Sequence, residues 1–154
     1  MAHVREGVWV GEERVFGLYN WSTNETLKID YPAAYCGLDP EDTYVGFDFW
    51  ADKLVEPFAG RFKFDVPADS CRVIAVRKLV NRPFVVSTSR HVASPAFDIV
   101  EESWDPATRT LSGRSTVVPG EPYELRIFSG GRLRRASFRP CVSGFAWKVV
   151  GPWP

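Results

Sequence analysis

The residues closest to a catalytic arrangement are Ser87, Ser89, Arg90 and His91. A serine hydroxyl beside an imidazole is the pairing that nucleophilic catalysis uses, because the imidazole accepts the hydroxyl proton. Alternate residues of a strand share a face, so Ser89 and His91 can lie on one side. The sequence identifies neither a supporting acid nor an oxyanion hole. We therefore expect a structural or hydrogen-bonding role for this cluster.

Two pairs of carboxylates, Asp48 with Asp52 and Glu101 with Glu102, are the next candidates. Glycosidases need two carboxyl groups on opposite sides of the scissile bond. The spacing places neither pair across a cleft, and adjacent residues of a strand point to opposite faces. We expect these carboxylates at solvated strand ends and turns, and we expect no catalytic residue in this chain.

The possible metal ligands lack a recognisable spacing. The histidines and cysteines are His3, His91, Cys36, Cys71 and Cys141. They are too scattered for a structural zinc site, and three cysteines cannot all pair within the chain, so we expect reduced, mostly buried thiols. A calcium site at Asp39, Glu41 and Asp42 stays open as an alternative, although this segment lacks the EF-hand pattern. We expect no metal and no cofactor.

Six tryptophans provide the aromatic surface that a ligand could stack on. They are Trp9, Trp21, Trp50, Trp104, Trp147 and Trp153. We expect Trp21 to belong to the core, Trp50 to cap an interface, and Trp147 and Trp153 to be the most exposed. Trp50, Trp104 and Trp147, with Arg90 and His91, are therefore our candidates for contacting a carbohydrate or a neighbouring domain.

The segments that carry these residues are predicted to be short strands. Residues 14–21 and 26–30, separated by turn formers, predict a hairpin. Strands are also predicted at 44–50 and at 61–66, where Phe62, Phe64 and Val66 alternate towards a core. The mixed faces of residues 71–77 are typical of a strand covered on two sides.

The second half continues with predicted strands at 84–87, 97–104, 110–117, 123–128, 133–139 and 144–150. Residues 105–109 form a strong turn, because Asp105 opens it and Pro106 fixes the bend. The chain is thus predicted to be an all-β, antiparallel β-sandwich, Greek-key or jelly-roll-like, with about ten to twelve short strands. We expect one domain over 1–154, with a possible subdivision into 8–80 and 84–150 packed against each other.

Composition agrees with this fold and excludes some function classes. The chain of 154 residues has an aromatic content of 14%, which suits strands. Lys plus Arg and Asp plus Glu number 19 each, so there is no broad positive field for nucleic acid. The local basic run of Arg132, Arg134, Arg135 and Arg139 is typical of a solvated strand edge. Without a signal peptide or an apolar span, the chain is expected to be soluble, with no membrane partner, and its compartment stays open.

Three stretches carry a resemblance to a known family. They are VFGLYNWSTNETLKID, CGLDPEDTYVGFDFW and GRFKFDVPADSCRVIAVRKL, and weaker similarity continues to about residue 128. Together they resemble the C-terminal β-sandwich module of glycoside hydrolases related to α-galactosidases and melibiases. In that family the catalytic carboxylates sit on a separate barrel, which this chain lacks, so the resemblance implies no catalytic residues here.

The resemblance implies a non-catalytic accessory module that supports or contacts a catalytic glycoside hydrolase domain. The alternative is a carbohydrate-binding module, which needs exposed aromatic rings arranged as a platform with polar groups at its rim. A small enzyme using the cluster at residues 87–91 is a third reading, and it requires a pocket with a perturbed imidazole and a nearby acid.

Overall fold

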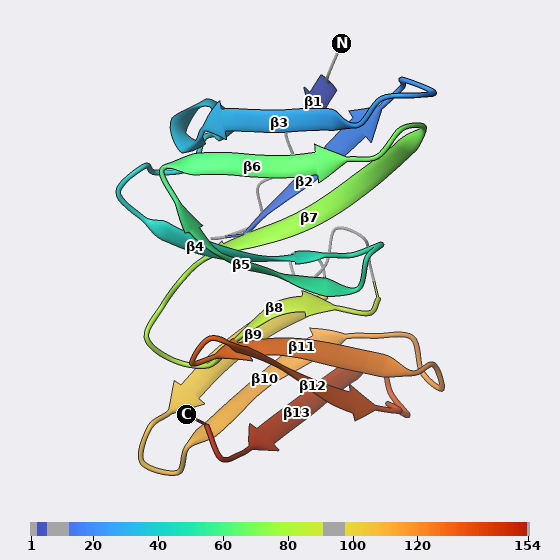
Figure 1. Ribbon diagram of the computed structural model, residues 1–154. Coiled ribbons are helices and arrows are strands. Elements are labelled where there is room, and N and C mark those ends of the chain that lie inside the picture. Colours follow the sequence, from blue (N-terminus) through green and yellow to red (C-terminus); the bar gives the residue numbers. More distant parts are fainter. Residues whose placement is uncertain (1–2, 6–12, 91–97, 154) are drawn as a thin grey trace. The chain divides into compact units, whose positions relative to one another are not determined.

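Strands make up nearly all of the regular structure (Figure 1). The computed structural model describes residues 3–5, 13–90 and 98–153, and within them it contains thirteen strands and one short 3-10 helix. The all-β, antiparallel, sandwich-like fold class is confirmed. In the same residues no helix is long and apolar enough to cross a membrane. The chain divides into two compact units, residues 1–79 and 80–154; the packing of the two halves stays a prediction.

The first unit contains a five-stranded sheet, in the order β1-β2-β7-β4-β5, and a two-stranded sheet of β3 and β6. Its elements are β1 (His3–Arg5), β2 (Glu13–Asn20), β3 (Leu27–Pro32), η1 (Ala33–Cys36), β4 (Thr43–Asp48), β5 (Lys53–Ala59), β6 (Arg61–Val66) and β7 (Ser70–Lys78). In Figure 1 the β3–β6 pair lies over β2 and β7. The two sheets therefore form the layers of a small sandwich.

Part of the core of this unit comes from strict alternation of buried and exposed residues along β6. Phe62, Phe64 and Val66 of β6 are buried while the residues between them are exposed, as predicted. They pack in one cluster with Phe16 and Leu18 of β2, and the Phe16 and Phe62 ring centroids lie 4.7 Å apart. Burying each such side chain stabilises the unit by about 2 kcal/mol.

The predicted hairpin between residues 14–21 and 26–30 is wrong. β2 pairs with β1 and β7, and β3 pairs with β6, so residues 21–26 carry the chain from one sheet to the other. The buried amide of Asn20 holds this crossing, because its Nδ2 donates to the carbonyls of Glu25 at 2.8 Å, Val66 at 3.0 Å and Pro67 at 3.0 Å. Turn-forming residues predict that the chain bends but not which strand it pairs with next.

The second unit is built from two three-stranded sheets, β13-β10-β9 and β12-β11-β8. Its strands are β8 (Phe84–Thr88), β9 (Ile99–Asp105), β10 (Thr110–Thr116), β11 (Tyr123–Ser129), β12 (Arg132–Phe138) and β13 (Gly144–Val150). Strands of both sheets contribute to one core cluster that includes Val85, Leu111, Leu125, Ile127 and Trp147.

The turn chemistry of this unit follows the sequence. The predicted hairpin around residues 105–109 joins β9 to β10, and the Asp105 carboxylate accepts hydrogen bonds from the Ala107 amide and the Thr108 hydroxyl. The same hydrogen bonds lower the pKa of Asp105. Gly130 and Gly131 both have positive φ and close the β11–β12 hairpin. Three arginines of the basic run, Arg132, Arg134 and Arg135, lie on β12, which is an edge strand as predicted, and Arg139 follows it.

Replacement of Gly113 tests the packing of β10 against β9 and β13. A Cβ atom at Gly113 would collide with the Glu101 carbonyl and the Trp147 ring. We expect Gly113→Ala to lower the free energy of unfolding by about 3 kcal/mol, because backbone and a buried ring cannot both give way. Gly144→Ala, on the paired strand with open space around its Cβ, is the matched control. Equal urea midpoints for the two variants would contradict this packing.

Candidate functional site

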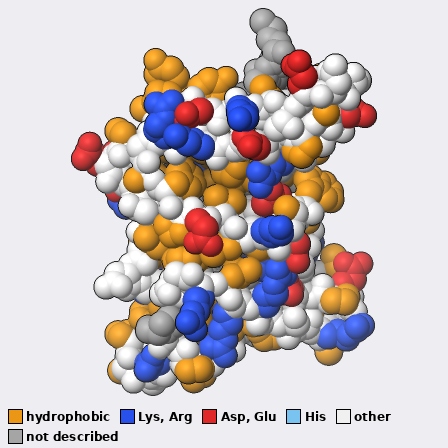
Figure 2. All heavy atoms as spheres, viewed as in Figure 1, with side chains coloured by type: hydrophobic (Ala, Val, Ile, Leu, Met, Phe, Trp, Pro, Cys, Tyr) orange, Lys and Arg blue, Asp and Glu red, His pale blue; other side chains and the backbone are white. Residues whose placement is uncertain are grey.

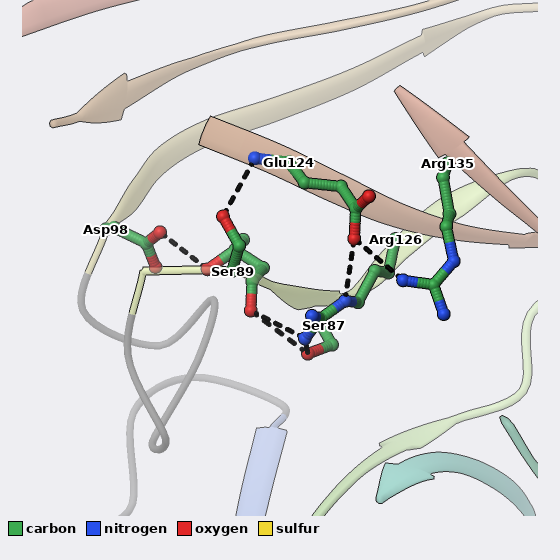
Figure 3. A network of polar contacts seen from close by, with 7 residues as sticks. Ser87, Ser89, Asp98, Glu124, Arg126 and Arg135 are labelled. Carbon is green, nitrogen blue, oxygen red and sulfur yellow. Dashed lines mark hydrogen bonds and ion pairs between the residues drawn. The ribbon is translucent and has the colours of Figure 1, made fainter. Parts of the chain in front are cut away.

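The serines of the predicted cluster join β8 to β11 (Figure 3). Ser87 is buried, and its hydroxyl accepts a hydrogen bond from Arg126 at 3.2 Å. The Ser89 hydroxyl accepts one from the Glu124 amide at 2.9 Å. Both hydroxyls are therefore used in cross-strand hydrogen bonds. The described residues place no imidazole beside them: His91, like Trp9, lies outside the described part of the chain, as does the side chain of His3.

Ser87 contacts a largely buried network of ion pairs and hydrogen bonds through Arg126. The Arg126 side chain is only 9% exposed, and its Nε donates to Glu124 at 3.1 Å while Nη1 donates to the Thr88 carbonyl at 3.0 Å. The same Glu124 oxygen accepts from Arg135 at 2.8 Å (Figure 3). Arg90 donates to the Thr116 carbonyl. These contacts hold strands together, and a guanidinium between a carboxylate and a carbonyl cannot act as a base.

A second polar cluster lies inside the second unit. The Ser115 hydroxyl accepts hydrogen bonds from Tyr123 and from the Trp147 indole, each at 2.9 Å. Asp98, which is 1% exposed, accepts from Thr88 at 2.7 Å. Burial, and then the nearby Asp98 carboxylate, raise the pKa of Tyr123. The phenol is therefore held neutral and donates its hydrogen bond to Ser115, which also accepts the Trp147 indole N–H.

The expectation that both carboxylate pairs are solvated is wrong for two of their members. Asp48 is 1% exposed and pairs with Arg72 at 2.5 Å. The Glu102 side chain is 10% exposed; it pairs with Arg82 and accepts a hydrogen bond from the Val85 amide. Glu101 is exposed and pairs with Arg114. Each buried carboxylate has a cation beside it, which is why it tolerates burial.

The calcium alternative finds no support in the contacts of residues 39–42. The Asp39 carboxylate accepts the Glu41 amide at 2.9 Å, and Asp42 pairs with Lys78 at 2.7 Å. Among the described residues no three His, Cys, Asp or Glu side chains come together as metal ligands would.

The cysteines are free thiols, and the expectation that they are mostly buried is wrong. Cys71 and Cys141 are exposed, and Cys36 is half-buried. Burial raises the pKa of the Cys36 thiol despite the nearby Arg14. Cys71 lies where β7 is just starting, so the strand's first residues are not yet covered.

The tryptophans are arranged almost opposite to their predicted exposure. Trp147 and Trp153, predicted to be exposed, are 3% and 5% exposed, whereas Trp21, predicted to be core, is 73% exposed. Trp104 is half-buried and packs edge-on against Trp153. Trp50, at 61%, is exposed as an interface residue requires. The exposed indoles of the described residues therefore both belong to the first unit.

Trp21 forms the outer layer of an aromatic stack. Its ring is stacked on Tyr19, with the centroids 6.0 Å apart and the planes 9° from parallel. Tyr19 lies in turn over Gly17, where a Cβ would sit only 3.0 Å from the tyrosine ring. A side chain at position 17 would lift Tyr19 from the sheet. Most of the Trp21 side chain is thus exposed to solvent while its ring contacts Tyr19.

Polar groups border this stack. The loop after Trp21 is closed by the Ser22 hydroxyl, which accepts the Glu25 amide at 3.1 Å. The Asp69 amide donates a hydrogen bond to the Ser22 carbonyl at 2.7 Å. The Asp69 backbone is in the left-handed region, with φ of 47°, and its side chain is exposed. The exposed acidic residues Glu25 and Asp69 are thus tied by their backbone amides to Ser22, the residue that follows Trp21. We call Tyr19, Trp21, Glu25 and Asp69 the Trp21 platform.

Sequence reasoning missed Tyr19 and Trp21 as a binding candidate. The signal was present, because residues two apart on a strand share a face and Ser22 to Asn24 mark the end of that strand. A tryptophan just beyond the last paired residue has little sheet around it to cover its ring.

The charge on the surface of the molecule is mixed. Figure 2 shows acidic and basic side chains interspersed with hydrophobic ones on the viewed face. The equal numbers of acidic and basic residues give the same result for the whole chain. A surface of this kind suits a neutral ligand better than a polyanion.

Comparison with known proteins does not assign the chain. It matches no model of a known protein family, and no curated protein matches it. The resemblance to the C-terminal module of α-galactosidase-like glycoside hydrolases therefore stays a prediction.

The ion pair between Arg72 and Asp48 is testable by substitution. We expect Arg72→Met to lower the free energy of unfolding by about 3 kcal/mol, because it leaves a buried carboxylate without its cation. Arg61→Met is the matched control, since its partner Asp30 is about half exposed at a similar distance of 2.6 Å. We expect little change there. Similar urea unfolding curves for both variants would show that burial of Asp48 does not matter.

The raised pKa of Tyr123 predicts a loss of stability at high pH. In the unfolded chain this phenol ionises near its ordinary value of 10, whereas in the folded chain it stays protonated to higher pH. Its contribution is therefore fully present below about pH 10 and falls above it, by at most about 1.4 kcal/mol per pH unit. Tyr123→Phe should flatten the dependence of the unfolding free energy on pH between 9 and 11. An unchanged slope would contradict the burial of this hydroxyl.

Proposed function

We propose that this chain is a non-catalytic carbohydrate-binding module and that Trp21 is its principal sugar contact. The observation that carries the proposal is the exposed indole stacked on Tyr19. A pyranose ring presents a face of C–H groups that stacks on an aromatic plane, and its hydroxyls need polar partners around that plane. The Trp21 platform supplies the apolar ring, and the exposed acidic residues Glu25 and Asp69 are bonded through their backbones to the residue that follows it.

The rigidity of the platform supports this function. Asn20 directs its amide to three carbonyls and accepts the Ser22 amide on its own oxygen at 3.0 Å, so the start of the Trp21 loop is fixed from within. A contact surface that is already ordered loses less conformational entropy on binding. Trp21 is thus suited to weak, shallow ligands such as glycans.

A second candidate is an accessory role beside a catalytic glycoside hydrolase domain. It rests on the resemblance of residues 8 to 128 and on exposed Trp50, which an interface would cover. The two candidates make different predictions, because an accessory module needs no sugar affinity of its own.

Substitution of Trp21 tests the proposed function. We expect intrinsic tryptophan fluorescence of the chain to change saturably on titration with one class of glycan, from a panel including galactosides, galactomannan, xylan, cellulose and mannan oligosaccharides. Trp21→Ala should weaken binding at least about tenfold by calorimetry, since loss of one stacking surface removes about 1.4 kcal/mol. Tyr35→Ala removes an aromatic side chain that is 80% exposed but lies on η1, and it should leave the affinity unchanged.

Two results would overturn the carbohydrate-binding proposal. One is silence across the whole panel, which would leave the accessory role as the remaining proposal. The other is binding that Trp21→Ala and Tyr35→Ala weaken equally, because the platform would then have no special part in it.

A further inference from the structure

A second exposed aromatic pair lies across β7 from the Trp21 platform. Trp50 is 61% exposed and packs edge-on against Phe49, with the ring centroids 5.1 Å apart. The Phe49 amide donates to the Val73 carbonyl of β7 at 2.9 Å. On the other side of β7, Tyr19 pairs directly with Cys71. Both aromatic pairs therefore flank the first residues of the same strand.

Strand geometry gives the separation of the two pairs. β2 and β4 are the two neighbours of β7 in the sheet, so their backbones lie two strand spacings apart, about 10 Å. The two anchor points, Cys71 and Val73, are two residues apart and so face the same side of β7. The separation of the β2 and β4 backbones therefore exceeds the length of a single pyranose ring.

The loop that carries Trp50 is fixed as firmly as the one that carries Trp21. The buried Asp48 carboxylate accepts the Ala51 amide at 3.1 Å and pairs with Arg72 of β7. Arg72 is held in turn by the Asp65 carbonyl at 3.1 Å, and it lies over the Phe64 ring. These contacts therefore hold the backbone of the turn that carries Trp50 against β7.

We propose that Trp50 is a second sugar subsite and that the ligand is a neutral oligosaccharide that spans β7 from Trp21 to Trp50. This inference rests on the proposed function and specifies that the ligand is longer than one sugar and carries no charge. Two stacking planes joined by one ligand act together, because the second contact forms within an already bound complex. Two exposed acidic residues, Glu25 and Asp69, have their backbones hydrogen-bonded to Ser22 next to Trp21, and their negative charge disfavours an anionic glycan there.

The test is a length series measured by calorimetry. The probes are the mono-, di- and tetrasaccharides of the galacto-, manno-, xylo- and cello-series, with tetragalacturonate as the anionic probe. We expect the tetrasaccharide of the preferred series to bind at least about tenfold tighter than its monosaccharide, and we expect tetragalacturonate not to bind. Trp50→Ala should remove the gain with length, whereas Trp21→Ala should weaken the binding of every saccharide in the preferred series. Trp50→Phe, which keeps an aromatic plane, should restore part of the gain.

The outcomes separate this inference from the function beneath it. Binding through Trp21 that does not depend on ligand length, or that Trp50→Ala leaves intact for the tetrasaccharide, overturns the second subsite and keeps the carbohydrate-binding module. Tight binding of tetragalacturonate overturns the assignment of a neutral ligand. If no probe binds, both proposals fail. Thermal unfolding of each variant, with Tyr35→Ala as the control, establishes that the changes act on binding and not on folding.

Discussion

The first unit depends on one buried amide, that of Asn20, at the point where β2 leaves its sheet. A chain that crosses between two sheets leaves backbone carbonyls without strand partners, and such groups are costly when buried. Asn20 satisfies three of them with a single side chain that is 6% exposed. Because the amide links the Trp21 loop to the β6–β7 connection, the position of the exposed indole follows from a buried hydrogen-bond network.

The turn that carries Trp50 is held in place by an ion pair, whereas the loop that carries Trp21 is held by the Asn20 amide. The ion pair joins Asp48 at the end of β4 to Arg72 near the start of β7. A buried carboxylate is tolerated only with its cation in place, so the pair fixes the register of the β4–β5 turn against β7. Two exposed indoles are thus positioned by polar contacts beneath them, while the apolar cores supply the general stability.

Local patterns predicted the strands well but not their partners. The alternation of Phe62, Phe64 and Val66 and the turn at Asp105 both reflect interactions within a few residues, and both are confirmed. The pairing of β2 with β7 joins residues 50 to 64 positions apart, and the turn formers after Trp21 carry no information about it. The strand partner is selected by which apolar faces meet in the folded unit, which a single sequence does not specify.

The exposure of Trp147 and Trp21 was mispredicted because it depends on where each residue lies within its strand. Trp147 alternates with Val149 inside β13, and it faces Gly113, whose missing side chain leaves room for the indole, and Ser115, whose hydroxyl accepts its N–H. Trp21 is as apolar but follows the last paired residue of β2, where the neighbouring strand has only begun. Burial of a large ring therefore depends on a small residue and a polar partner opposite it, and the rings that lack them are the ones left available for a ligand.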